Sequence, residues 1–257
     1  DQAQAAFERA RDAAPQQAFA YNNLGELYAL RAHLLRRVDI NPALSTQRAL
    51  AAYAQAIALM PRQAQFHANV AKVHHTQALW LLVHGHDPEP QLQQASQALD
   101  QALALSPGLA YALRYQGEVL AAHARWLARH GAARAEDFQR AATAFQAALD
   151  ADPEWPEYRL AAALLRAEWG EWLARSGTDA APVLQEGLAL LEPPLATRPR
   201  WADGLTAQAR LLLALSETHA PQAQRAEWLR ASRLRRYEAL RLNPHLDDQR
   251  DVWRPPL

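Results

Sequence analysis

Five histidines between residues 62 and 107 are the side chains best suited to chemistry in this sequence, because imidazole is the commonest metal ligand in proteins. On a helix, His67 and His74 would share a face, but seven residues at a rise of 1.5 Å separate them by about 10 Å. Two nitrogen ligands of one zinc ion lie only about 3–4 Å apart, so one ion cannot join this pair. The sequence also contains no cysteine, which removes thiolate ligands and nucleophiles. We therefore expect no metal and no cofactor. The five residues are His67, His74, His75, His84 and His86.

Motifs of known enzyme classes are missing from the sequence. Lys72 is the only lysine and Val73 follows it, so no phosphate-binding loop of the form GxxxxGK[ST] exists. The HExxH, GxSxG, HRD and DFG motifs are absent as well. Glu168 and Glu171 lie three residues apart, but Arg175 follows Glu171 by four, which predicts an ordinary helical ion pair. We expect no catalytic residue here, although a catalytic domain could exist elsewhere in a parent protein.

The elements that carry these residues are set by a repeat. Prolines recur at intervals of 46 residues, with one final interval of 45, and a fixed period of this kind is typical of a solenoid. The tenth residue after each proline is Gly or Ala, which lets a neighbouring helix approach closely. Gly85, Gly131 and Gly177 recur with the same period and predict the end of a first helix in three repeats. The recurring prolines are Pro15, Pro61, Pro107, Pro153, Pro199 and Pro244.

The second half of each repeat resembles a known family. Ala49, Tyr53, Ala56 and Pro61 follow the small–aromatic–small–proline pattern of the tetratricopeptide repeat (TPR), whose usual period is 34 residues. The twelve additional residues fall between the two helices of a repeat, so the first helices should be elongated. The resemblance implies an all-α, right-handed α-solenoid of stacked antiparallel helix pairs. The inter-helix loop 84–90, HGHDPEP, is similar to loops in the C-terminal TPR arrays of some bacterial Ser/Thr protein kinases.

We expect one TPR-like array over residues 1–257, and a lone half repeat at the start suggests a fragment of a longer protein. Its parts are a half repeat at 1–15, repeats at 16–61, 62–107, 108–153, 154–199 and 200–244, and a C-terminal cap or tail at 245–257. The expected first helices are Ala18–Arg37, Ala64–Val83, Ala110–Arg129, Pro156–Arg175 and Ala202–Ser216.

Bulky and helix-breaking residues give two more expectations. Trp80, Trp126 and Trp172 recur in register and should pack in the core along the elongated first helices, since a buried aromatic removes a large area from water. Pro193 and Pro194 should kink or end the second helix of the fourth repeat, because proline cannot donate a backbone hydrogen bond.

Charge and hydropathy limit the range of partners. The formal net charge is zero, so bulk charge gives no reason to expect nucleic acid or an anionic membrane. No apolar run reaches about 18 residues, the length of a membrane span, and no basic-then-apolar signal pattern occurs at the start. We expect a cytoplasmic protein. The arginine-rich stretch 224–242 is either a solvated end cap or a surface for an acidic partner or RNA, and the sequence leaves both open.

The resemblance implies a function in protein interaction. In TPR domains the concave groove is lined by the first helix of each repeat, so we expect a non-catalytic scaffold that binds a peptide or protein there. It could be the regulatory array of a bacterial signalling Ser/Thr kinase. The alternative is a self-assembly module that stacks through its open ends. The residues implied at the concave face are Asn22, Glu26, Lys72, His75, Arg114, Glu118, Arg125, Arg129, Glu171, Arg175 and Arg210.

Overall fold

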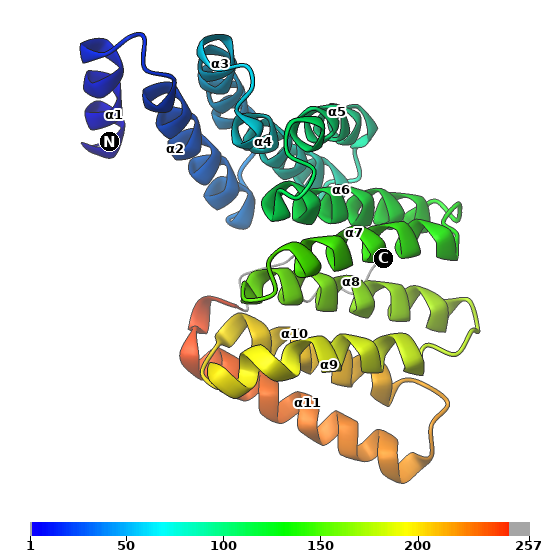
Figure 1. Ribbon diagram of the computed structural model, residues 1–257. Coiled ribbons are helices and arrows are strands. Elements are labelled where there is room, and N and C mark those ends of the chain that lie inside the picture. Colours follow the sequence, from blue (N-terminus) through cyan, green and yellow to red (C-terminus); the bar gives the residue numbers. More distant parts are fainter. Residues whose placement is uncertain (1, 247–257) are drawn as a thin grey trace. The chain divides into compact units, whose positions relative to one another are not determined.

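Residues 2–246 are described by a computed structural model, and within this range the secondary structure consists of helices and turns without strands (Figure 1). The all-α fold class is therefore confirmed. Two compact units, residues 1–126 and 127–257, are described separately below. No helix among residues 2–246 is both long and apolar enough to cross a membrane.

Helix pairs of nearly constant length build both units. First helices of 20 residues are followed by second helices of 17 in all but the last described pair, whose helices have 15 and 21 residues. The two helices of the first, second, fourth and fifth pairs lie side by side. The spans expected for the five first helices are confirmed. The first unit contains α1 (Gln2–Ala13), α2 (Ala18–Arg37), α3 (Ala43–Leu59), α4 (Ala64–Val83), α5 (Glu89–Leu105) and most of α6 (Ala110–Arg129). The second contains the end of α6, then α7 (Ala135–Ala151), α8 (Pro156–Arg175), α9 (Ala181–Thr197), α10 (Ala202–Ser216), α11 (Gln222–Leu242) and the short 3₁₀ helix η1 (Pro244–Leu246).

The first helices end at residues with a left-handed backbone. Gly85, Gly131 and Gly177 have φ values of 73°, 68° and 72°, which glycine adopts without steric cost. These glycines therefore end their helices as the sequence predicts. In the first repeat the same place, 46 residues before Gly85, is taken by Asp39 with φ of 63°, a conformation that aspartate tolerates better than most residues.

Short acidic and amide side chains start the second helices. Asn41, Asp87 and Asp179 occupy equivalent places, and each accepts a hydrogen bond from the backbone N–H two residues later, at 2.9, 2.9 and 3.0 Å. Such bonds satisfy donors that the first turn of a helix leaves unpaired. The third repeat has Ala133 at this place, and there Asp137 accepts from the backbone N–H of Arg134 at 2.9 Å instead.

Small residues bring the helices of each unit close together. Ala49, Ala95 and Ala141 recur with the repeat period and are fully buried. Tyr53 packs directly over Gly25, and a Cβ atom added to Gly25 would lie only 2.6 Å from the tyrosine ring. The small residue at the place of Gly25 therefore leaves room for the aromatic ring of the following helix.

The expectation that the three register tryptophans are core residues is confirmed in part. Trp80, Trp126 and Trp172 are partly buried, and Trp172 packs against the core of the second unit. The Trp80 ring stacks on His84 with centroids 4.0 Å apart, and Trp172 lies 5.2 Å from the ring of Phe138. A side chain as large as tryptophan is rarely covered completely, and these three lie near the ends of their helices, where neighbouring turns are fewer.

The second helix of the fourth repeat does not end at Pro193 and Pro194, because α9 continues to Thr197. Each proline lacks the N–H that would bond the carbonyl four residues earlier, and both prolines lie in the last two turns of the helix. The carbonyl of Pro194 accepts from the backbone of Arg198 at 2.8 Å and from the Thr197 hydroxyl at 3.1 Å. Burial of Leu191 and Pro194 then holds this end of the helix in place.

Gly25→Ala should destabilise the first unit by roughly 1–3 kcal/mol, the usual cost of overpacking. The added methyl group would collide with the buried Tyr53 ring, which the hydroxyl bond to Glu26 holds in position. Chemical denaturation of the whole chain measures the loss. Gly108→Ala is the matched control, since nothing lies within 4 Å of the added atom. Equal stabilities of the two variants would contradict the close packing described above.

Candidate functional site

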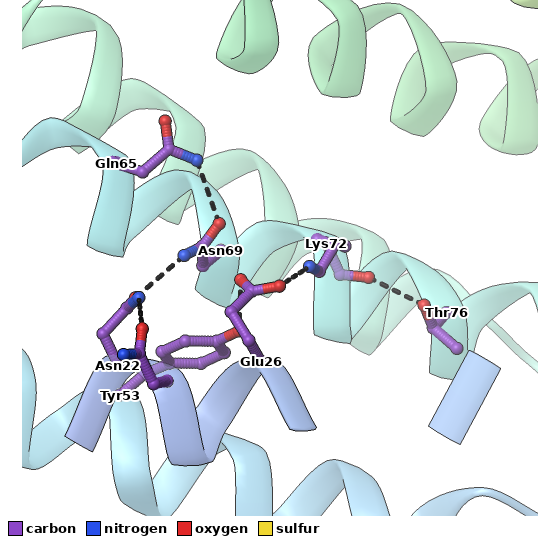
Figure 2. Close-up of polar contacts among 8 residues, drawn as sticks. Asn22, Glu26, Tyr53, Gln65, Asn69, Lys72 and Thr76 are labelled. Atoms are coloured by element: carbon purple, nitrogen blue, oxygen red, sulfur yellow. Dashed lines mark hydrogen bonds and ion pairs between the residues drawn. The ribbon is translucent and has the colours of Figure 1, made fainter. Parts of the chain in front are cut away.

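One column of the repeat carries charges that face each other across the first unit. Glu26, Lys72 and Glu118 occupy the eleventh place of successive repeats, on α2, α4 and α6. The Lys72 Nζ atom lies 2.6 Å from Glu26 Oε2, and the Tyr53 hydroxyl donates to Glu26 Oε1 at 2.7 Å (Figure 2). Glu26 therefore links α2 to both α3 and α4.

Amides continue this polar link toward the start of the helices (Figure 2). The Asn69 side chain on α4 donates to Asn22 Oδ1 on α2 at 2.9 Å, and Gln65 donates to Asn69 at 3.1 Å. Farther along α4, the Thr76 hydroxyl donates to the Lys72 carbonyl at 2.9 Å. The polar side chains predicted for the concave face are thus largely bonded to one another.

A second charged group lies between α4 and α6. Arg114 donates to Glu118 Oε1 at 2.8 Å, and His75 Nε2 lies 3.9 Å from Glu118 Oε2. Burial raises the pKa of Glu118, but the Arg114 guanidinium more than offsets it, so the pKa lies below its usual value. Burial also lowers the pKa of His75 to about 4, against the attraction of Glu118, so the imidazole is neutral near pH 7. His75 is only 5% exposed, and its Nε2 atom has no hydrogen-bond partner.

These side chains line a groove of about 600 Å³ in the first unit. Apolar side chains from α1, α2 and the end of α4 also line it. Five of the predicted residues line the groove, namely Glu26, Lys72, His75, Arg114 and Glu118. The apolar lining includes Phe7, Leu27, Leu30 and Leu79. His33 and Arg36, from the last turns of α2, complete the polar lining.

The predicted residues of the second unit form a separate group. Arg210 donates to both oxygens of Glu171, at 2.8 and 2.9 Å, and lies 3.8 Å from Glu168. The expected pairing of Glu171 with Arg175 is therefore wrong, because Glu171 is held by α10 and Arg175 is exposed. Burial lowers the pKa of Arg210, but the bond to Glu171 raises it above its usual value. Arg129, in the last turn of α6, is partly buried, as is Arg125 in the first unit.

The histidines of the second repeat have separate roles. His67 contacts Gln101 at 3.0 Å and the Pro61 carbonyl at 2.9 Å, while His74 contacts Gln91 at 2.8 Å. His84 lies 3.2 Å from Asp39, in the preceding loop. Among residues 2–246 no group of three or more His, Cys, Asp or Glu side chains is arranged to hold a metal ion.

Some groove residues were not predicted from the sequence. Leu30, His33 and Arg36 lie in the C-terminal half of α2, and none of them was among the binding residues that the family resemblance implied. The pairing of Glu26 with Lys72 could have been found, since opposite charges 46 residues apart in a 46-residue array must be neighbours.

One known protein family matches part of the chain. The family described as plant specific mitochondrial import receptor subunit TOM20 matches residues 81–167, about a third of the chain, and so does not define its family. None of the curated proteins compared with the chain matches it.

Solved structures are also similar to the chain. YrrB, described as a TPR protein with an unusual peptide-binding site, is 16% identical over 96% of this chain and 97% of its own, with a TM-score of 0.40. The structure described as a human IFIT1 dimer with PPP-AAAA is 13% identical over 90% of this chain and 68% of its own, with a TM-score of 0.32. Both TM-scores are below 0.5, so the fold assignment rests on the helices of the chain itself.

Arg210→Met should destabilise the second unit by roughly 3–5 kcal/mol, because it leaves Glu168 and Glu171 as two neighbouring, partly buried carboxylates without their cation. Arg175→Met, on the exposed end of α8, should change stability by less than about 0.5 kcal/mol. Urea denaturation of both variants checks this. A larger loss for Arg175→Met would restore the pairing inferred from the sequence.

His75 should make the first unit less stable as the pH falls. The pKa of His75 is about 4 in the folded chain and 6.5 ordinarily, so below pH 6.5 the unfolded chain binds more protons. Stability from this group should fall by about 2 kcal/mol between pH 7 and pH 5, and the fall should end below pH 4. Comparing the free energy of unfolding of the parent chain with that of His75→Gln isolates this contribution. Parallel pH profiles for the two proteins would exclude it.

Proposed function

We propose that this chain is a non-catalytic scaffold that holds a peptide or protein segment in the groove of its first unit. The observation that carries the proposal is the groove itself, which has a volume of about 600 Å³ and is lined by both apolar and charged side chains. A concave site that is partly apolar, with a few polar groups that fix orientation, is the usual form of a binding site. The partial match to an import receptor subunit family lends support to a protein partner.

The ion pairs among the charged lining residues indicate how such a segment would bind. Glu26 and Lys72 neutralise each other, as do Arg114 and Glu118. Contacts with the apolar lining residues would then supply most of the affinity. The charged lining residues would mainly set the rate of association and its salt dependence. Reversing the charge of Arg114 is therefore a poor test of binding, because it would place a new carboxylate beside Glu118.

The cellular role is a finer part of the proposal. The loop 84–90 resembles those of TPR arrays attached to bacterial Ser/Thr kinases, which suggests that the scaffold recruits partners for a signalling enzyme in the cytoplasm.

Self-assembly is a second candidate, favoured by apolar side chains on α11. Leu234 and Tyr237 are 54% and 60% exposed, and Arg241 lies over the Tyr237 ring at 5.9 Å. Exposed apolar residues on one helix face are typical of contact surfaces. Light scattering of the purified chain over a range of concentrations would detect a dimer or filament, and a constant monomer mass would exclude this role.

Leu30→Ser tests the groove. A random peptide library displayed on phage is selected on the immobilised chain, and enriched peptides are labelled for fluorescence anisotropy. Loss of the leucine contact should weaken binding of these peptides roughly fivefold, since part of the buried apolar area is removed.

Leu44→Ser is the matched control, because Leu44 is 61% exposed and Leu30 56%, but Leu44 lies on α3 outside the groove lining. Its affinity should equal that of the parent chain. Absence of enriched peptides, or equal loss with both substitutions, would overturn the assignment of the groove.

A further inference from the structure

One face of α2 lacks the cover that the equivalent face of α4 has within the described residues. Asn69 and Lys72 lie on one face of α4 and donate hydrogen bonds to side chains of α2, and Thr76 follows them on that face. Leu30 stands in α2 at the place of Thr76, yet it is 56% exposed and Thr76 only 7%. Asn23, at the place of Asn69, is exposed as well. This part of α2 is therefore a helix-packing face that stays open to solvent.

The same places are covered in later repeats. Ala122 on α6 and Ala214 on α10 correspond to Leu30 and are 1% and 7% exposed. Three residues earlier, Val119 is 3% exposed, whereas its counterpart Leu27 is only partly buried. In a stacked array each first helix buries this face against the preceding pair. A helix laid against α2 would therefore remove two leucine side chains from water.

Exposed apolar side chains continue from α2 into the loop that follows it. Leu34, in the last turn of α2, is 51% exposed, and Val38 and Ile40 in the loop are 66% and 53% exposed. The next three repeats are also exposed at the places of Val38 and Ile40, but they carry polar or small residues there. These residues are His84, His86, His130, Ala132, Ser176 and Thr178. Because the array leaves these places exposed in all four repeats, apolar residues there add nothing to its own packing.

Leu34, Val38 and Ile40 lie close together at the end of α2. In the second repeat the Trp80 ring, at the place of Leu34, stacks on the imidazoles at the other two places, with centroids 4.0 and 6.2 Å apart. The first repeat has the same backbone bond, because the Ile40 N–H donates to the Leu35 carbonyl at 2.9 Å, as its counterpart does. Contiguous exposed apolar surface of this kind is typical of a contact site. The side chains of this apolar patch are Leu30, Leu34, Val38 and Ile40.

Exposed arginines border the apolar patch on two sides. By helical spacing, Arg31 and Arg37 lie at opposite edges of the stripe that carries Leu30 and Leu34. Neither arginine forms an ion pair with another described residue. Two copies of the patch facing each other would bring these like charges together, which disfavours a symmetric dimer. Carboxylates on a partner would instead gain attraction from both arginines.

We propose that the apolar patch binds an amphipathic helix of a partner protein, which lies against α2 as α2 lies against α4. Leucine-sized side chains spaced by three or four residues would pack on Leu30 and Leu34, and Asp or Glu beside them would face the two arginines. The patch adjoins the groove at Leu30, but its other three members are not groove-lining residues. The proposal goes beyond the groove function and does not depend on it.

The test selects peptides on the immobilised full chain. A phage library displays 20-residue peptides, the length of α2, on a helix-forming framework with random residues along one face and Glu or Lys at equal frequency beside it. Enriched peptides should carry Leu, Ile, Met or Phe at spacings of three and four residues, with Glu outnumbering Lys. A proline in the middle of the tightest peptide, on its solvent side, should weaken binding at least about tenfold, because proline breaks a helix.

Leu34→Ser should weaken binding of the tightest peptide roughly fivefold, since part of the buried apolar area is removed. Leu105→Ser is the control, because Leu105 is an exposed leucine of the first unit that lies on α5, outside the patch and the groove lining. The affinity of this control should equal that of the parent chain in fluorescence anisotropy. Thermal melting of both variants verifies the fold, and the proline peptide tests the proposal without any protein substitution.

Several outcomes would overturn the proposal. Absence of enriched peptides, tolerance of proline, or equal affinities of the two leucine variants would show that the patch does not bind a helix. A dimer in light scattering that Leu34→Ser abolishes would assign the patch to a second copy. Binding to this chain but not to a longer polypeptide that contains it would assign the patch to a helix of the same chain.

Failure of this proposal and failure of the groove function are distinguishable. Peptides whose binding depends on Leu30 but not on Leu34 would lie in the groove, which contradicts the patch and leaves the groove function standing. Peptides whose binding depends on Leu34 would support the patch, whatever the outcome of the groove test.

Discussion

Close packing through alanine and glycine is the constraint on which the rest of this structure depends. Fully buried residues such as Ala49, Ala95 and Ala141 let helices of one unit approach until backbones and rings touch, as Tyr53 does over Gly25. At such short separations the side chains of successive repeats meet in register. Opposite charges at the same place of successive repeats can then pair directly, as Glu26 and Lys72 do.

Much of the fold could be predicted because its signals are local. Positive-φ glycines such as Gly85 mark helix ends, and the recurring prolines fix the period, so the first helices were located residue by residue. Packing outweighed local rules elsewhere. Pro194 is buried within a helix that continues past it, and Trp80, near the end of α4, is only partly buried.

The site was predicted in part, for a physical reason. Glu26, Lys72 and Glu118 stand in a column that the family resemblance identifies, and they do line the groove. The partners of charged residues were harder to infer, because spacing along one helix says nothing of the next helix. Arg175 is four residues from Glu171, yet Arg210 has two donors aimed at the same carboxylate, and a bidentate bond is the stronger one.

The two halves of a first helix differ in what their side chains contact. In the first half of each first helix, charged side chains such as Lys72 form ion pairs between helices. These side chains therefore stabilise the array and have few hydrogen-bonding groups available for a ligand. In its C-terminal half, α2 carries Leu30, which is 56% exposed, and Arg36, and both side chains line the groove. Additional helix length therefore creates surface that the stack does not need for its own stability. Selection can change residues on such surface at little cost in folding, which makes the elongated segment the natural place for partner specificity.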